Sequence, residues 1–140
     1  MAPRQGALDH SALLALLLAF GSSFTTMAGV NVTLAPGAIT GSLDVYLTST
    51  GNGANALTTR TAAQMFADLC AAFGLNDVTG LSYSLTITNT GNNTVTLTAG
   101  TNVTLTGTMT IATNTTRTFV VTVNGPNAIT IQSVGVGSIS

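Results

Sequence analysis

The stretch TVTLTAGTNVTLTGTMTIATNTTRTFVVTV, residues 94–123, decides the fold class of this 140-residue chain. Nearly every second position is threonine, and apolar residues alternate with it, as in Val95 and Leu97 or Val121 and Val123. A period of two places the apolar side chains on one face of a strand. Threonine is β-branched and carries a hydroxyl, so it suits the wet face opposite the core. The stretch therefore predicts several short strands, each with one buried face.

The same alternation continues on both sides of this stretch, between segments of turn-forming residues. The other alternating apolar pairs are Leu85/Ile87, Val103/Leu105, Met109/Ile111 and Ile129/Ile131. Residues 30–40 and 41–50 add two short strands, and residues 49–55, STGNGAN, form a loop. The predicted fold is mainly β, an antiparallel β-sandwich or a small jelly-roll-like barrel.

One segment has helical rather than strand periodicity, and we predict a short amphipathic helix over residues 61–73. Thr61 followed by Gln64 forms a capping box, and Gly74 is suited to end the helix. The apolar residues that recur at helical spacing are Met65, Phe66, Leu69 and Phe73.

The N-terminal segment contains an apolar run, ALLALLLAF, at residues 12–20. It resembles a secretory signal, because Arg4 precedes it and small residues follow it, but Asp9 and His10 stand where a signal favours only positive charge. The run is too short to span a bilayer, which takes about 20 residues. We therefore predict an apolar arm or buried helix within residues 1–28, ahead of a β-sandwich domain over residues 29–140.

The chain carries few charges, and this limits its partners. Only 5% of residues are charged, against about 25% in soluble domains, and neither Lys nor Glu occurs. The basic residues Arg4, Arg60 and Arg117 stand far apart, so we expect no nucleic-acid binding, and we expect no membrane partner. A hydrophobic content of 45% also argues against disorder.

The low charge also predicts an assembly. Charged residues are a main protection of strand edges against pairing with other chains, so uncharged edges favour a homo-oligomer, a dimer or a trimer, whose neighbours cover them. The interface candidates are Leu13, Leu14, Leu17, Phe20, Phe24, Arg60 and Arg117. The arginines are expected either to pair with an aspartate or to lie in an intersubunit contact.

Residues capable of catalysis or metal binding are scarce, and we expect no enzyme activity, cofactor or metal. His10 lies beside Asp9 and Ser11, but a triad needs an oriented base and an oxyanion hole. Cys70 is expected to be a buried small hydrophobe, Asp68 a solvated helix residue and Asp77 a cap or turn residue. Four Asn-x-Ser/Thr sequons, at Asn31, Asn92, Asn102 and Asn114, are expected by chance in a chain rich in Asn and Thr.

Residues 56–136 resemble a module of viral structural proteins found in tailed phages and large DNA viruses. The most specific part runs from Thr86 to Phe119, where ITNTGNNTVTLTAGTNVTLTG leads into NTTRTF, and an AITI strand follows. The resemblance implies a non-enzymatic virion component, usually oligomeric. We expect a capsid decoration, or cement, protein on the virion surface, whose partner is the major capsid protein.

Three alternatives stay open. A head-fibre or tail-spike module would bind a receptor or glycan through loops such as STGNGAN or NGPN, residues 124–127. A secreted bacterial adhesin or pilin-like subunit would have a signal cleaved near Ala28. An ice-binding surface of threonine arrays is disfavoured, because the strands are unequally spaced in the sequence.

Overall fold

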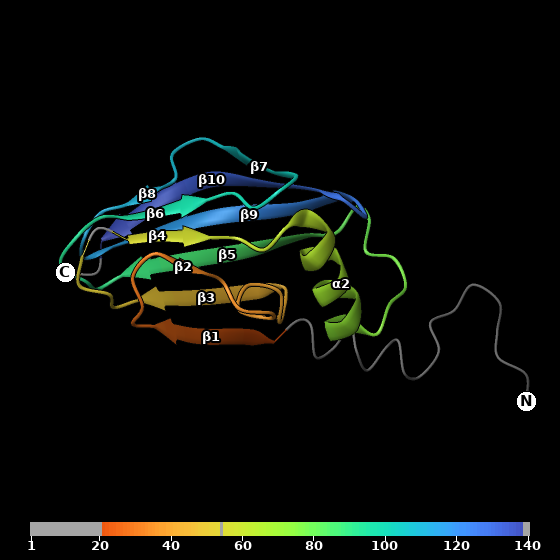
Figure 1. Ribbon diagram of the computed structural model, residues 1–140, viewed down its shortest axis with the longest axis horizontal. Helices are drawn as coiled ribbons and strands as arrows, with labels where there is room; N and C mark the ends of the chain where they lie inside the picture. The colour runs from red at the N-terminus through yellow and green to blue at the C-terminus, as the bar shows by residue number, and fades with distance from the viewer. Residues whose placement is uncertain (1–20, 54, 139–140) are drawn as a thin grey trace, which may run out of the picture.

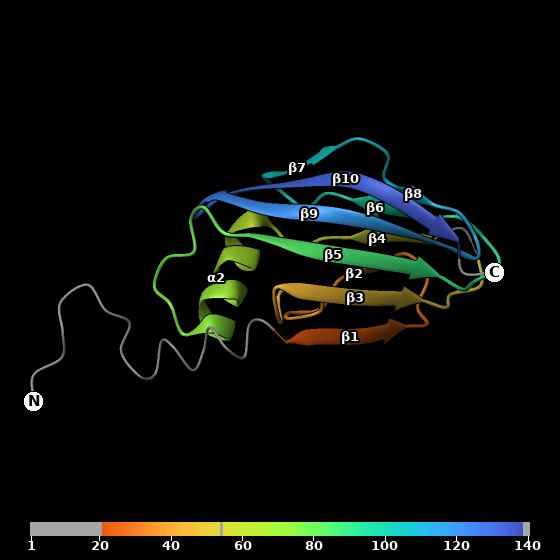
Figure 2. The same ribbon diagram turned by 180° about the vertical axis from the view of Figure 1, so that it is seen from behind.

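The computed structural model describes residues 21–53 and 55–138, which fold into two β-sheets and one helix (Figures 1 and 2). Sheet A contains, in spatial order, β1 (Ser22–Met27), β3 (Asp44–Ser49), β5 (Ser82–Asn89), β9 (Thr115–Gly125), β10 (Ala128–Ser138) and β7 (Val103–Thr106). Sheet B contains β2 (Val32–Thr33), β4 (Asn55–Thr58), β6 (Val95–Thr98) and β8 (Thr110–Ile111). The prediction of a mainly β, sandwich-like fold with one short helix is confirmed.

The first six strands form three stacked coils, each with one strand in sheet A and the next in sheet B. The coils are β1–β2, β3–β4 and β5–β6. Strands β1, β3 and β5 pair in parallel and in register, so that Phe24, Tyr46 and Thr86 lie side by side. Strands β2, β4 and β6 pair in parallel in the same way. These strands are therefore parallel, where the sequence predicts antiparallel neighbours.

The C-terminal strands provide the antiparallel pairings. Strand β9 lies antiparallel between β5 and β10, and β8 lies antiparallel to β6. Strand β7 is parallel to β10 and forms the far edge of sheet A. The antiparallel expectation thus describes the closing strands, whereas the coiled part differs because alternation along one strand does not specify the direction of its neighbour.

The core lies between the two sheets and consists of the alternating apolar residues. Almost every predicted member is buried, including Leu85, Phe119 and Ile131, each fully shielded from solvent. Leu105 and Met109 are partly buried against the same cluster. The predicted inward face is therefore confirmed, with two members at its rim.

Helix α2 (Ala62–Phe73) connects β4 to β5 and crosses the strand ends at one end of the sheets (Figure 1). Thr61 and Gln64 form the predicted capping box, and Gly74 ends the helix in the left-handed conformation at φ 66°. Its buried face consists of Ala62, Met65, Leu69 and Phe73. The predicted helix and both of its ends are confirmed.

The sheet begins earlier than the predicted domain boundary at residue 28. Residues 22–27, which the sequence assigns to an N-terminal arm, form β1 and pair with β3 over their whole length. The rest of the predicted arm or helix, residues 1–20 with the candidates Leu13, Leu14, Leu17 and Phe20, lies outside the described residues.

Candidate interaction surface

Three glycine turns lie one above the other at the end of the sheets opposite α2, where each coil passes from sheet A to sheet B. They contain Gly29, Gly51 and Gly91 and follow the last residues of β1, β3 and β5. Backbone hydrogen bonds tie each turn to the coil before it: the Thr50 N–H donates to Met27 O at 2.8 Å, and the Thr90 N–H donates to Ser49 O at 2.9 Å. A β-carbon at Gly91 would overlap the Gly51 carbonyl oxygen, so the stack requires glycine there.

Two buried asparagines hold this turn stack together. Asn55 donates to Gly29 O at 3.3 Å and to Ser49 Oγ at 3.1 Å, and its Oδ1 accepts from the Asn31 N–H at 2.7 Å. Asn89, the last residue of β5 in the third coil, is fully buried. It donates to Asn93 O at 2.7 Å and to Ile111 O at 2.9 Å, and it accepts from the Gly91 N–H at 3.0 Å. Each amide thus satisfies backbone groups that the turns leave unpaired.

The first coil ends the stack on one side, and we call the surface formed by β1 and β2 the open end. Both strands are edge strands at the same end of the molecule (Figures 1 and 2). Met27 O accepts from Thr50, so the backbone groups of Met27 face β3. Backbone groups alternate in direction along a strand, so those of Ser22, Phe24 and Thr26 face the free edge.

Phe24 is the largest apolar side chain on the open end. It is 77% exposed, and its ring stacks on Tyr46 with the centroids 5.0 Å apart and the planes at 10°. Neither β1 nor β2 carries a charged residue. The nearest carboxylate on β3 is Asp44, which accepts a hydrogen bond from Ser22 Oγ at 3.0 Å and raises the pKa of Tyr46. The predicted interface candidate Phe24 therefore lies on an uncharged strand that, within residues 21–53 and 55–138, forms an edge of sheet A with no partner strand.

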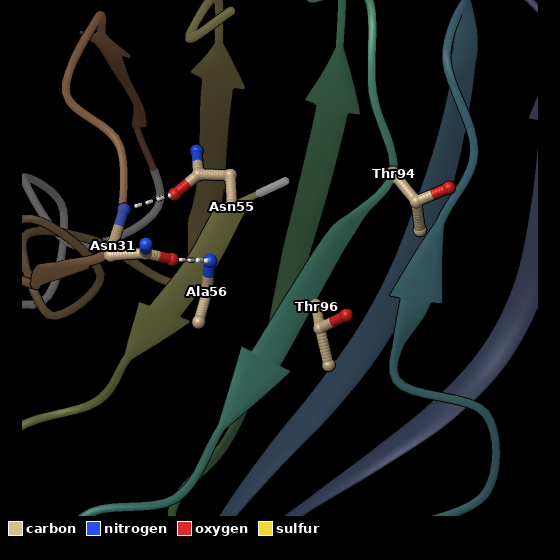
Figure 3. Close-up of a pocket in the computed structure, with 5 residues that line it drawn as sticks. All are labelled: Asn31, Asn55, Ala56, Thr94 and Thr96. Atoms are coloured by element: carbon tan, nitrogen blue, oxygen red, sulfur yellow. Dashed lines mark hydrogen bonds between the residues drawn. The ribbon is translucent and has the colours of Figure 1, made fainter. Parts of the chain in front are cut away.

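A shallow, open pocket of about 340 Å³ lies over β4 and β6 (Figure 3). Asn31, Asn55, Ala56, Thr94 and Thr96 line it. Asn31 is fixed in place because its Oδ1 accepts from the Ala56 N–H at 2.9 Å while its own N–H donates to Asn55. Within the described residues, the Asn31 Nδ2 and the hydroxyls of Thr94 and Thr96 make no hydrogen bond, so they are free for a ligand.

The outer face of sheet A carries a row of hydroxyls. Thr26, Thr48, Thr88 and Thr116 lie side by side on β1, β3, β5 and β9. Unequal spacing in the sequence therefore does not prevent alignment in space. The neighbouring row begins with Phe24 and Tyr46, so the array is interrupted beside its first members.

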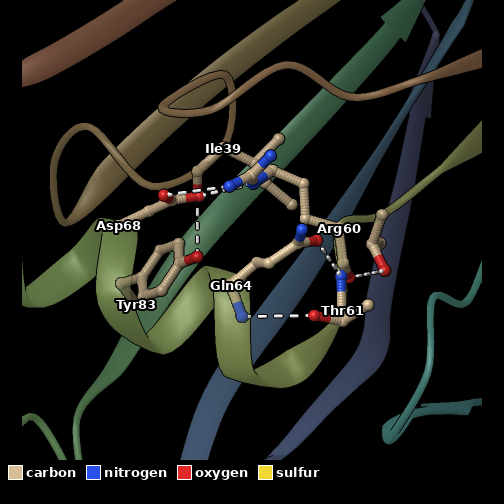
Figure 4. Close-up of polar contacts among 7 residues, drawn as sticks. Ile39, Arg60, Thr61, Gln64, Asp68 and Tyr83 are labelled. Carbon is tan, nitrogen blue, oxygen red and sulfur yellow. Dashed lines mark hydrogen bonds and ion pairs between the residues drawn. The ribbon is translucent and has the colours of Figure 1, made fainter.

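The arginine candidates both have partners within the chain. Arg60 donates from Nε to Asp68 Oδ2 at 2.8 Å, with side chains 24% and 15% exposed, and the pair joins α2 to the segment before it (Figure 4). The prediction that Asp68 is a solvated helix residue is therefore wrong, because Asp68 forms a salt bridge with Arg60. Arg117 donates from Nε to Thr110 O at 2.8 Å. Among the described residues, the Arg60–Asp68 pair is the only salt bridge.

The other residues considered for chemistry have structural surroundings. Burial raises the pKa of the half-buried Cys70 thiol, and the charge of Asp77 raises it further, which disfavours the thiolate. Asp77 accepts from the hydroxyl and the N–H of Thr79 in a turn, as predicted, and these bonds lower the pKa of Asp77. No cluster of three metal-ligating side chains occurs in the described part of the chain.

Three of the four sequon asparagines have a conformational reason for their positions. Asn31, Asn102 and Asn114 adopt positive φ angles of 57°, 63° and 58°. Asparagine tolerates this left-handed region better than most residues. Turn geometry therefore explains why asparagine stands at these three positions, and glycosylation is not needed to explain them.

Tyr83 links the sheet to the segment between the first two coils. It is buried, and its hydroxyl donates to Ile39 O at 2.7 Å (Figure 4). Burial, followed by the charge of Asp68, raises the pKa of Tyr83 far above its ordinary value of 10.0. The folded protein therefore keeps the Tyr83 proton at pH values where the unfolded chain loses it.

We expect stability to fall as the pH rises above about 10, by up to about 1.4 kcal/mol per pH unit from this one group. Tyr83→Phe removes the titration and the hydrogen bond, so it should cost about 1 kcal/mol at pH 8 and flatten the alkaline decline. Urea unfolding between pH 8 and 11.5 measures both effects. Tyr46→Phe is the control and should keep most of the decline, because the charge of Asp44 raises the pKa of the exposed Tyr46 less than burial raises that of Tyr83. Equal slopes for wild type and Tyr83→Phe would refute the role of Tyr83.

Comparison with known proteins gives no match for this chain among family models, curated proteins or solved structures. Within the described residues, no helix is long and apolar enough to cross a membrane.

The sequence predicts the loop at residues 49–55, but not the burial of Asn55 and Asn89 or the stacking of the three glycine turns. A signal for them exists, because Thr-x-x-Gly recurs at residues 26–29, 48–51 and 88–91. Repeats are usually found by a fixed period. Here the period is not fixed: the interval between the second and third Thr-x-x-Gly motifs is longer than that between the first and second, because α2 lies between the second and third coils.

Proposed function

We propose that this protein is a non-enzymatic structural component of a virion, a decoration protein on the capsid surface that stabilises the head by bridging major capsid subunits. The observation that carries the proposal is the open end. Among the residues that the structure describes, it combines two strand edges without a partner strand, no charged residue on β1 or β2, and a Phe24 ring that is 77% exposed. Such a surface is suited to permanent cover by another subunit.

Two further features support an assembly role on a virion. The resemblance of residues 56–136 to modules of viral structural proteins indicates that the assembly is a virion. The uncharged row of threonine hydroxyls on sheet A offers neutral surface for contacts beside the open end. Stable association takes an interface of about 1,600 Å², and repetition over a shell multiplies the stabilisation that each contact gives.

Copy number in purified particles tests this proposal. A lysate of the culture that produces the particles is separated on a density gradient, and mass spectrometry measures this chain relative to the major capsid protein. Hundreds of copies in each DNA-filled particle are expected for a decoration protein. A few copies would instead support a fibre or spike, and absence from the particles would contradict a virion role.

The pocket of Figure 3 favours a second candidate function, that of a receptor-binding fibre or spike module. Its free groups are an amide and two hydroxyls, and no charged residue lines it. Neutral donors and acceptors of this kind match the hydroxyls of a saccharide. The pocket volume of about 340 Å³ is at the lower end for small-molecule sites.

A glycan array, probed with the full chain, tests this second function. Thr96→Val keeps the shape of the side chain and removes one free hydroxyl, so we expect it to weaken binding of any captured glycan about tenfold. Thr88→Val makes the same change on sheet A, away from the pocket, and should have no effect. Equal weakening by both variants, or no glycan captured, would count against the pocket.

A further inference from the structure

We infer that the open end binds a second copy of this chain, with β1 pairing antiparallel to β1 of the second copy about a two-fold axis. Phe24 lies on that axis, opposite Phe24 of the second copy. This inference deepens the proposed function, because it names one partner of the same surface. It concerns purified protein in solution, so its test is independent of any particle.

The direction of the backbone groups on β1 fixes the register. The N–H and C=O groups of Ser22, Phe24 and Thr26 face the free edge, whereas those of Met27 face β3. An antiparallel ladder forms only between residues that face each other with both groups. Centring the axis on Phe24 uses all three residues, with Phe24 opposite Phe24 and Ser22 opposite Thr26.

This register also gives the exposed aromatic ring a partner. Residues directly opposite in an antiparallel pair have side chains on the same face, with β-carbons about 5 Å apart. Phe24 already stacks on Tyr46 at 5.0 Å. The dimer would therefore contain a row of four rings across the sheet, Tyr46 and Phe24 from each copy, which covers Phe24.

The charges near the edge permit the pairing. In this register, the two Asp44 carboxylates would lie about 13 Å apart along the strands and about 14 Å apart across them. Both separations exceed the Debye length of about 8 Å at physiological salt, so the repulsion between the two carboxylates is largely screened. No charged residue stands on β1 or β2 to oppose the approach.

The same two-fold axis also brings the edges of sheet B together. Strand β2 ends sheet B at the same end of the stack at which β1 ends sheet A. A two-fold axis normal to the sheets therefore turns both free edges toward those of the second copy. An isologous interface of this kind is self-complementary and closes after two subunits.

Sedimentation velocity of the full chain over a range of concentrations tests the inference. We expect a dimer in wild type. Phe24→Lys and Phe24→Glu should each be monomeric, because each places like charges directly opposite one another across the axis. Mixing these two variants should restore the dimer as a heterodimer, since opposite charges then face each other. Thr86→Lys is the matched control in the same row on β5 and should stay dimeric.

Three results would overturn the inference. The first is a wild-type monomer at every concentration; protection of the Phe24 and Thr26 amides from hydrogen exchange in such a monomer would mean that another segment of the chain covers the edge. The second is a dimer that Phe24→Lys leaves intact, which would place the interface elsewhere. The third is a mixture of the two charged variants that stays monomeric although circular dichroism shows both variants folded. A decoration role on particles would survive the first result, because the capsid protein could then be the only partner of the open end.

Discussion

Asn89→Asp is expected to be the most destabilising isosteric change among the residues that the structure describes. The substitution removes both N–H donors that reach Asn93 O and Ile111 O, and it places a carboxylate oxygen against these carbonyl oxygens. Each unpaired buried group costs about 1–3 kcal/mol, and a buried unpaired charge costs several more. The loss of at least about 4 kcal/mol approaches the whole stability of a domain, about 5–15 kcal/mol.

Urea unfolding at pH 7 and pH 4 measures this effect. Acid protonates the carboxylate and restores one donor, so the variant should recover part of its stability at the lower pH. Asn92→Asp is the control, because Asn92 is exposed in the same turn and should tolerate the charge. Similar small losses for both variants would mean that the Asn89 contacts do not hold the turn stack.

Gly91→Ala should have the second largest effect, because it separates two turns that touch through their backbones. The added methyl group would overlap Gly51 O, and this neighbour is main chain that cannot rotate away. Overpacking typically costs 1–3 kcal/mol. Since the second and third coils must shift apart, we expect about 3 kcal/mol and a Tm loss of about 10 °C.

Thermal unfolding followed by circular dichroism measures the loss, with Gly125→Ala as the control. A β-carbon at Gly125 meets no atom within 4 Å, so its melting temperature should change by no more than about 2 °C. A Gly91→Ala protein that melts like wild type would show that the turns at Gly51 and Gly91 do not touch through their backbones.

The sequence predicts the elements of this fold well and their arrangement only in part. Alternation at Leu85 and Ile87, or at Val121 and Val123, identifies a strand and its buried face because the period is a property of that strand alone. Thr61, Gln64 and Gly74 specify the ends of α2 for the same local reason. Strand direction depends on contacts between distant segments, and the parallel coils were therefore not predicted.

The candidate surface was predicted less completely. The sequence predicts Phe24 as an interface residue, and it lies on an edge strand, but the same prediction places it in an N-terminal arm rather than in a strand. Threonines and serines dominate β1, so no apolar period shows that it is a strand. Asn55 and Asn89 look like ordinary loop asparagines, and only the stacking of the coils shows that they are buried.

Competition for particles tests most directly whether the protein is a virion component that acts through its open end. Wild-type and Phe24→Lys chains, distinguished by mass, are co-expressed in the culture that produces the particles, and their ratio is measured in lysate and in gradient-purified DNA-filled particles. We expect the wild-type chain to be enriched at least about tenfold in particles, as the loss of roughly 1.4 kcal/mol or more at each contact implies, whereas Thr86→Lys should compete equally with wild type. Equal incorporation of wild type and Phe24→Lys would contradict a role for the open end, and absence of both chains from the particles would contradict the virion role itself.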